Sequence, residues 1–234
     1  MSDWSQKMNH NPNQKICLIG LGQVYESITA DLHAYAHPDT QWLFRPISRT
    51  VSLEDCADSI LSGIPEDASL FIAVEPTRMN YDRLELYGRA KERGLPMVNL
   101  IHKAAYCSPD VILGNNIWMG AGAVVDYQVK IGDDSMISPM ARIDPRVTIG
   151  NHCWIGRGAS ILAGTTIGEH CTIGNDTQIE EYINIGRQCV ILCPGLWDRS
   201  LPAGTFVERK ASESFPPSRI IGEGYSFNTG VEAE

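Results

Sequence analysis

The sequence predicts a small α/β domain followed by a left-handed parallel β-helix. An aliphatic or methionine side chain returns at every sixth residue from Leu113 to Ile191, without an insertion. A glycine follows this side chain at every eighteenth residue, and the part before it alternates short apolar strands with helices. Neither a helix nor an ordinary strand requires a period of six, whereas stacked coils with one apolar column do.

The period also predicts how one coil is built. The residue two places before the aliphatic one is small or compact in most repeats, as in Ala123, Ala141 and Cys171. Eighteen residues are three hexapeptides, so three flat faces form a triangular coil, and one corner carries Gly114, Gly132, Gly150, Gly168 and Gly186. Glycine is expected where a corner needs a backbone conformation that a Cβ opposes. We expect four to five coils between about residues 105 and 193.

The first part of the chain alternates predicted strands and helices. In order, these are a strand at 15–20, a helix at 25–36, a strand at 41–47, a helix at 53–61, a strand at 69–74, a helix at 78–94 and a strand at 96–101. Such alternation predicts a small parallel sheet flanked by helices, in a Rossmann-like domain. We therefore expect a disordered leader (1–14), a Rossmann-like substrate-binding domain (15–104), a β-helix domain (105–210) and a flexible tail (211–234).

Composition excludes several classes of function. The net charge of −9 argues against a nucleic-acid surface. No segment approaches the roughly 18 unbroken apolar residues of a membrane span. The seven cysteines include no CxxC pair, and three of them occupy the small-residue position of the repeat. This pattern predicts a reducing, cytoplasmic compartment and no metal site.

The turn after the first strand is the candidate binding element of the α/β domain. Gly20-Leu21-Gly22 resembles the start of a nucleotide-binding fingerprint, but the third glycine is absent. The second strand ends in Arg45-Pro46, where an acidic residue would bind a ribose. We expect a substrate pocket at the carboxyl ends of these strands, and the alternative is a docking domain without a ligand.

An α/β domain, the run from Val98 to Lys103, the hexapeptide coils and Gly204-Thr205-Phe206-Val207 together resemble one known group. These are bacterial acetyl-CoA-dependent sugar acetyltransferases, which act on sialic acid or on amino-sugar nucleotides. The resemblance covers roughly residues 15–210. It implies a homotrimer, acetyl-CoA in the cleft between neighbouring β-helices, and a sugar or nucleotide-sugar substrate held by the N-terminal domain.

The resemblance also implies positions for the site. The family's general base is a histidine, and Tyr127 stands at that position. A second histidine, near the thioester, matches Met136; Arg157 and Asn175 match further acetyl-CoA positions. Arg157 either pairs with a CoA phosphate or is a solvated turn residue. The substrate positions correspond to Gly20, Gly22, Gln23, Arg45 and Glu75.

The replaced histidines change the chemistry that is available. Acyl transfer is helped by a base with a pKa near 7, whereas free tyrosine titrates near 10 and methionine does not titrate. Asp126 and Asp144 are eighteen residues apart and therefore neighbours in space. Paired carboxylates can raise one pKa toward neutrality, so both join Tyr127 as catalytic candidates. Alternatively, they are turn acids that bind corner amides.

His152 and His170 are also eighteen residues apart, so we expect them to stack on adjacent coils. They occupy a different corner from Tyr127, and we interpret them as exposed turn residues. The leading hypothesis is an acyl-CoA-dependent acyltransferase that acts on a sugar in glycan or natural-product assembly. The alternative is a catalytically inactive relative that serves as a binding or assembly protein.

Overall fold

The N-terminal sheet consists of three parallel strands. In the computed structural model, which describes residues 13–48, 53–76, 80–208 and 219–220, these are β1 (Lys15–Leu21), β2 (Gln41–Pro46) and β3 (Ala68–Val74). Their order in the sheet is β2-β1-β3. The interior of β1 and nearly all of β3 are buried, as expected of parallel strands that are covered on both faces.

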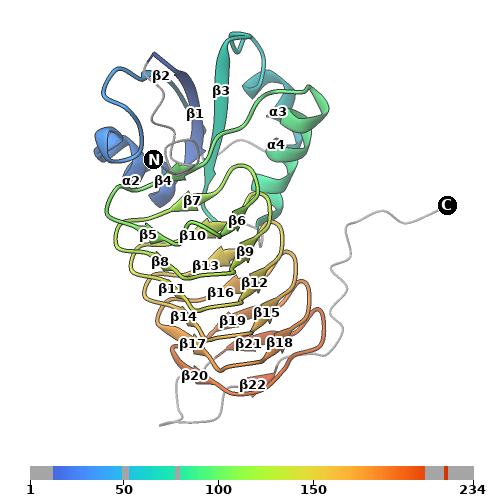
Figure 1. The fold of residues 1–234 in the computed structure, drawn as a ribbon. Helices are drawn as coiled ribbons and strands as arrows, with labels where there is room; N and C mark the ends of the chain where they lie inside the picture. The colour runs from blue at the N-terminus through green and yellow to red at the C-terminus, as the bar shows by residue number, and fades with distance from the viewer. Residues whose placement is uncertain (1–12, 49–52, 77–79, 209–218, 221–234) are drawn as a thin grey trace, which may run out of the picture.

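Helices cover the two faces of this sheet (Figure 1). On one face, α2 (Gln23–Ala30) and the short 3-10 helix η1 (Leu32–Ala34) pack with Phe71. On the other face, α3 (Leu53–Ile60) and α4 (Tyr81–Glu92) pack with Ile72. The predicted helix at 25–36 is split, because Asp31 has non-helical backbone angles. The alternation of strands and helices is confirmed, and the Rossmann-like classification stays a prediction.

The prediction of a fourth strand in this sheet is wrong. Only Met97 bridges to Leu70 at the edge of β3, and Leu100–Ile101 forms β4, which joins the β-helix by pairing with β7. The rest of the β3 edge is occupied by side chains. Asn116 accepts a hydrogen bond from Ile72 N (2.8 Å) and donates one to Ile72 O (3.1 Å). The amide of Asn116 thus takes the place of a neighbouring strand.

The β-helix consists of three sheets that follow one another around each coil, and their strands are parallel except for β22 (Figure 1). The first contains β4 (Leu100–Ile101), β7 (Trp118–Met119), β10 (Met136–Ile137), β13 (Trp154–Ile155), β16 (Thr172–Ile173), β19 (Val190–Leu192), β21 (Phe206–Glu208) and β22 (Arg219–Ile220). The second contains β5 (Tyr106–Cys107), β8 (Val124–Val125), β11 (Arg142–Ile143), β14 (Ser160–Ile161), β17 (Thr177–Ile179) and β20 (Gly195–Trp197). The third contains β6 (Ile112–Leu113), β9 (Lys130–Ile131), β12 (Thr148–Ile149), β15 (Thr166–Ile167) and β18 (Asn184–Ile185).

Residues eighteen apart pair in register, as Ile137 does with Ile155. The β-helix has about six turns over residues 100–207, more than the expected four to five. It begins before the predicted boundary at residue 105, because β4 already belongs to it. The parallel β-helix is confirmed, and the left-handed sense of its winding stays a prediction.

The interior of the coils is the apolar column that the period predicts. The aliphatic residues from Ile131 to Ile191 are buried, and the small-residue position holds Cys153, Cys171 and Cys189 without exposure. Hydrogen bonding to Cys153, together with burial, raises the pKa of Cys171. Thiols of this kind are unreactive and act as small apolar groups.

The glycines at the corners are required for a different reason from the backbone conformation that we expected. Gly114, Gly132, Gly150, Gly168 and Gly186 do not have positive φ angles. Instead, the next coil lies against them: a Cβ on Gly168 would lie 2.5 Å from Arg187 N, a backbone atom. Positive φ angles occur at other corner positions, including His152, His170 and Gln188. The glycines are therefore required by the close stacking of coils.

Both ends of the chain extend beyond the described residues. Most of the predicted leader (1–12) and of the predicted tail (211–218 and 221–234) lie outside them. Within the range of the predicted tail, Arg219–Ile220 forms β22 and pairs antiparallel with β21. Among the described residues, no helix is both long enough and apolar enough to span a bilayer.

A matched pair of glycine substitutions tests the stacking argument. We expect Gly168→Ala to lower the free energy of unfolding by about 1–3 kcal/mol, because the new methyl group meets the backbone of the next coil. Gly88→Ala, in α4 with nothing within 4 Å of the new atom, should raise it by about 0.5–1 kcal/mol. Urea denaturation measures both. Equal effects of the two substitutions would contradict this cause.

Candidate functional site

Tyr127 lies at an exposed corner of the β-helix, two residues after the end of β8. Its side chain is 44% exposed, and its hydroxyl accepts a hydrogen bond from Arg146 Nη1 at 3.4 Å. Hydrogen bonds to Tyr182 and Tyr127 hold the pKa of Arg146 above its ordinary value. The corner therefore presents two phenol groups around one permanent cation. Such a surface can bind an anionic or polar group of a ligand.

Asp126 and Asp144 lie on adjacent coils at the same corner, and each already has a partner. Asp144, whose side chain is 13% exposed, accepts two hydrogen bonds from Arg142, at 2.6 and 3.0 Å. Hydrogen bonding to Asp144 raises the pKa of Arg142. Asp126 Oδ1 accepts a hydrogen bond from the Tyr127 amide at 2.7 Å. The Arg142 guanidinium therefore lies beside this pair of acids and offsets part of their negative charge.

The predicted acetyl-CoA residues do not lie together. Arg157 and Asn175 lie on adjacent coils at a second corner, where Asn175 Oδ1 accepts a hydrogen bond from Arg157 N at 2.9 Å. Met136 is fully buried, in the apolar cluster between the β-helix and the N-terminal domain with Trp118 and Tyr35. Its side chain therefore contributes to the packing of the two parts of the protein.

Four of the five predicted substrate residues gather at the carboxyl ends of β1 and β3. Gly22 directly follows β1 and is the N-cap of α2, with φ of 80°. Glu75 directly follows β3, and its Oε2 accepts a hydrogen bond from Gln23 N, the first amide of α2, at 3.2 Å. A Cβ on Gly22 would lie 2.1 Å from the Glu75 carboxylate carbon. A Cβ on Gly20 would likewise lie 2.5 Å from Ala73 O, a backbone atom of β3.

Arg45, the fifth of the predicted substrate residues, instead binds backbone carbonyl groups of the protein. Its guanidinium donates hydrogen bonds to the carbonyl oxygens of Ile60 (2.7 Å), Ser62 (2.6 Å) and Gly63 (3.1 Å). These carbonyl groups lie at the end of α3 and just beyond it. The last carbonyl groups of a helix have no partner within the helix, so Arg45 caps α3.

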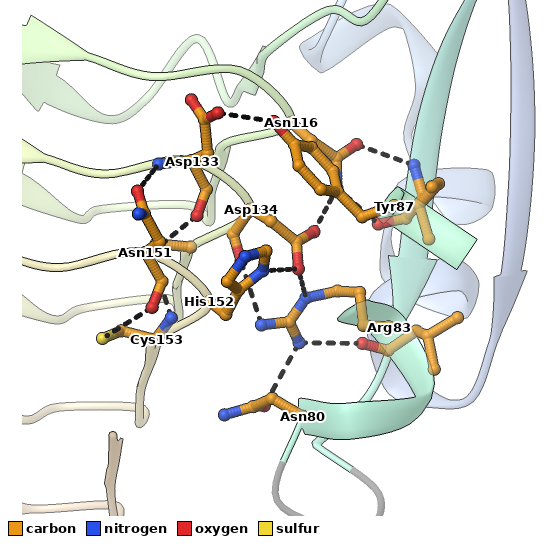
Figure 2. Close-up of polar contacts among 12 residues, drawn as sticks. Asn80, Arg83, Tyr87, Asn116, Asp133, Asp134, Asn151, His152 and Cys153 are labelled. Carbon is orange, nitrogen blue, oxygen red and sulfur yellow. Dashed lines mark hydrogen bonds and ion pairs between the residues drawn. The ribbon is translucent and has the colours of Figure 1, made fainter. Parts of the chain in front are cut away.

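A buried polar network joins the two parts of the protein (Figure 2). Arg83 of α4 and Asp134 of the β-helix are both fully buried, and Arg83 Nε lies 2.9 Å from Asp134 Oδ2. Arg83 also donates hydrogen bonds to Asp134 O, to Val74 O at the edge of β3, and to Asn80 Oδ1. Asn116 donates to Asp134 Oδ1 at 2.6 Å. Arg83, Asn116 and Asp134 thus each have a hydrogen-bonding partner in another segment of the chain.

The interpretation of His152 and His170 as exposed turn residues is wrong. His152 Nδ1 lies 2.9 Å from Asp134 Oδ2, and its side chain is only 12% exposed. The two imidazole rings stack with centroids 4.8 Å apart, and Tyr81 of α4 stacks on His170 at 5.6 Å. The expected stacking on adjacent coils is confirmed. The exposure was misjudged because α4 covers this corner.

Arg83 is the residue that the sequence analysis missed. It lies in a helix rich in charged residues, where an arginine normally faces solvent. Its partner Asp134 belongs to a column of polar residues at eighteen-residue intervals, namely Asn116, Asp134, His152, His170 and Gln188. These residues all have positive φ angles, which favour Asn, Asp and His, and a corner that faces solvent would also be polar. The column therefore does not distinguish a covered corner from an exposed one.

Comparisons with known proteins place the fold. Residues 146–181 match the family described as bacterial transferase hexapeptide (six repeats). Perosamine N-acetyltransferase from Caulobacter crescentus, solved as a histidine mutant with CoA and GDP-perosamine, is 22% identical, with a TM-score of 0.67 and coverage of 89% of this chain and 97% of that one. The acetyltransferase domain of PglB from Neisseria gonorrhoeae, solved with acetyl coenzyme A, is 19% identical (TM-score 0.58; 89% and 100% covered).

A third solved structure, WeeI from Acinetobacter baumannii, is 16% identical, with a TM-score of 0.56 and coverage of 89% of this chain and 100% of that one. A search of curated proteins gives no match. At these identities, the structural likeness establishes a shared fold over both parts of the chain.

The buried ion pair predicts a large effect of one substitution. We expect Arg83→Met to lower the free energy of unfolding by about 3–5 kcal/mol, because it leaves the Asp134 carboxylate buried without its cation. Arg89→Met removes an exposed arginine from the same helix and should change stability little. Chemical denaturation compares the two variants. A cost for Arg83→Met no greater than that for Arg89→Met would contradict this role.

The stacked histidines predict a pH dependence of stability. Burial lowers the pKa of His170 from its ordinary value, and His152 and Arg83 lower it further, while Glu169 and Asp134 oppose them. The unfolded chain therefore takes up a proton near pH 6.5 that the folded protein resists, so stability should fall as the pH falls below about 6.5.

His170→Gln should reduce this slope, whereas His33→Gln, which removes an exposed histidine, should retain it. Thermal unfolding between about pH 5 and 8 measures the slope for each variant. An equal slope in the wild type and in His170→Gln would show that another group carries the dependence.

Proposed function

We propose that the protein is an acyl-CoA-dependent acyltransferase, with acetyl-CoA as co-substrate, that acts on a sugar or nucleotide sugar in surface glycan or natural-product biosynthesis. The observation that carries this proposal is the architecture: an α/β domain fixed on the first coils of a β-helix, shared along 89% of the chain with acetyltransferases solved with CoA or acetyl-CoA. The match of residues 146–181 to the bacterial transferase hexapeptide family also supports a transferase. The buried free thiols of Cys153, Cys171 and Cys189 are consistent with a cytoplasmic location.

In this proposal, the corner around Tyr127 is the site of acyl transfer. Asp126 Oδ2 takes the proton from the amine or hydroxyl that attacks the thioester carbonyl, because Oδ1 is held by the Tyr127 amide and Asp144 is paired with Arg142. The C–S bond of the thioester then breaks, and the CoA thiolate leaves with the proton that Asp126 returns. The Tyr127 hydroxyl, with Arg146 beside it, orients the acceptor. An amine acceptor suits this site better than a hydroxyl, since a neutral amine needs orientation more than a strong base.

The co-substrate is proposed to lie between two copies of the β-helix in a homotrimer. The face formed by the second sheet and its corner exposes large apolar side chains, namely Tyr106 (57%), Val124 (38%), Met140 (66%) and Leu196 (54%). Exposed apolar patches of this kind are typical of protein interfaces. Arg157, whose side chain is exposed, is proposed to pair with a CoA phosphate. Asn175 then orders the backbone beside it.

The second candidate function is that of a binding or assembly protein without transferase activity. The observation that favours it is the pairing of Asp144 with Arg142, which is the arrangement of a structural ion pair. Acyl-CoA binding and turnover distinguish the two candidates.

We expect calorimetry to detect acetyl-CoA binding to the wild type, and a thiol-release assay with amino sugars to detect turnover. Asp126→Asn should reduce turnover by about 10²–10⁴-fold with acetyl-CoA affinity retained, because it removes the base. Asp198→Asn, which removes an exposed acid from a distant coil, should leave both unchanged. Failure to bind any CoA species would rule out the transferase. Turnover that survives Asp126→Asn would rule out Asp126 as the base.

A further inference from the structure

We propose that the acceptor is an acidic sugar chain: Arg146 binds a sugar carboxylate, and Tyr127 and Tyr182, one on each side of it, pack against the neighbouring sugar rings. These three residues lie along one corner of the β-helix and are called the corner row. The inference rests on the proposed function, because it names the substrate class of the acyl-transfer site.

The corner row lies in the turns between the second and third sheets. Tyr127 lies in the turn after β8, Arg146 in the turn after β11 one coil later, and Tyr182 in the turn after β17 two coils beyond. Arg146 Nη1 donates to the Tyr127 hydroxyl at 3.4 Å, and Tyr182, from the coils on the other side, bonds the same guanidinium. At one strand spacing per coil, the row extends over roughly 14 Å, which is longer than one pyranose ring.

The coil between Arg146 and Tyr182 leaves space for the tyrosine ring. Gly164 occupies the corner of this coil, and a Cβ there would lie 2.6 Å from Cδ1 and Cε1 of Tyr182. The ring therefore lies over Gly164, on the side toward Arg146. Arg146 and Tyr182 have φ angles of 62° and 57°, a region that favours Gly, Asn and Asp, so the backbone alone does not explain these two side chains. Residues in such sparsely populated conformations cluster at ligand sites.

The protein does not neutralise the charge of Arg146. Its two bonded partners are phenols, which carry no charge at neutral pH, and no carboxylate among the described residues forms an ion pair with it. The side chain is exposed, and a guanidinium bonded to two phenols still has N–H groups for a carboxylate. Asp126 and Glu181, which directly precede the two tyrosines, would repel a group with several charges, such as a diphosphate. The corner row therefore suits one negative charge, that of a sugar carboxylate.

The two exposed rings form the apolar part of the site. Tyr127 is 44% exposed and Tyr182 is 68% exposed, although large aromatic side chains are usually buried for the most part. A pyranose presents C–H groups on its faces and hydroxyl groups at its rim, and tyrosine combines an apolar ring with a polar hydroxyl in the same way. Because Tyr127 lies at the proposed acyl-transfer site, the sugar packed on it receives the acyl group. Arg146 and Tyr182 then bind the next residues of the chain.

The test measures, by calorimetry, the binding of a galacturonic acid trimer and of the corresponding neutral galactose trimer to the full-length protein. We expect the wild type to bind the acidic trimer about tenfold more tightly, because a charge-assisted pair is added. Arg146→Asn should remove this preference, whereas Tyr182→Asn should weaken both trimers by a similar factor of about threefold or more. Asparagine suits a positive φ angle, so both variants should fold. Arg187→Gln, which removes an exposed arginine from another corner, should match the wild type.

Equal affinity of the wild type for the two trimers, or no binding of either, would overturn the inference. A preference for the acidic trimer that survives Arg146→Asn, once circular dichroism shows that the variant is folded, would do the same. Monomeric galacturonic acid that binds as tightly as the trimer would overturn the assignment of a chain, and displacement of the acidic trimer by inorganic pyrophosphate would show a phosphate site instead. Acetyl-CoA binding is measured separately: a protein that binds no CoA species would lose the proposed transferase function, while the trimer comparison would still test Arg146.

Discussion

The ion pair between Arg83 and Asp134 is the contact on which the arrangement of the whole molecule depends. Neither side chain has any exposed surface, and the two residues come from different parts of the fold. Removing two charges from water is costly, and their mutual attraction offsets this only when the remaining polar atoms are also bonded. Here Asn116, His152 and the carbonyl group of Val74 provide those bonds.

A network of this kind specifies position more than it adds stability. An apolar contact between α4 and the β-helix would tolerate sliding, whereas a bonded guanidinium accepts one arrangement. The same network closes the edge of β3, because Asn116 and Arg83 bind the backbone of Ile72 and Val74. An open strand edge is a site of unwanted pairing, so the junction also protects the sheet. Apolar packing of Trp118 and Met136 against the N-terminal domain completes the junction.

The sequence was sufficient for the β-helix and insufficient for the junction, for a physical reason. Coil stacking is a repeated local rule, so Ile137 and Ile155 are placed by counting. Arg83 and Asp134 meet across 51 residues, and nothing in the residues around Arg83 indicates a buried charge. The strand at 96–101 was assigned to the wrong sheet, because an apolar run does not show which edge it joins. The clustering of Gly20, Gly22, Gln23 and Glu75 followed from strand order, but the contact of Glu75 with α2 required side-chain geometry.

Native-state hydrogen exchange tests most directly the claim that the junction makes the two parts one cooperative unit. If it does, the most protected amides of α4, around Leu86, and those of β10 and β13 exchange through the same global opening, with the same free energy and denaturant dependence. The claim would be contradicted if the amides of α4 and β3 exchanged through a smaller opening while Ile137 and Ile155 stayed protected. That result would show an N-terminal domain that detaches from an intact β-helix.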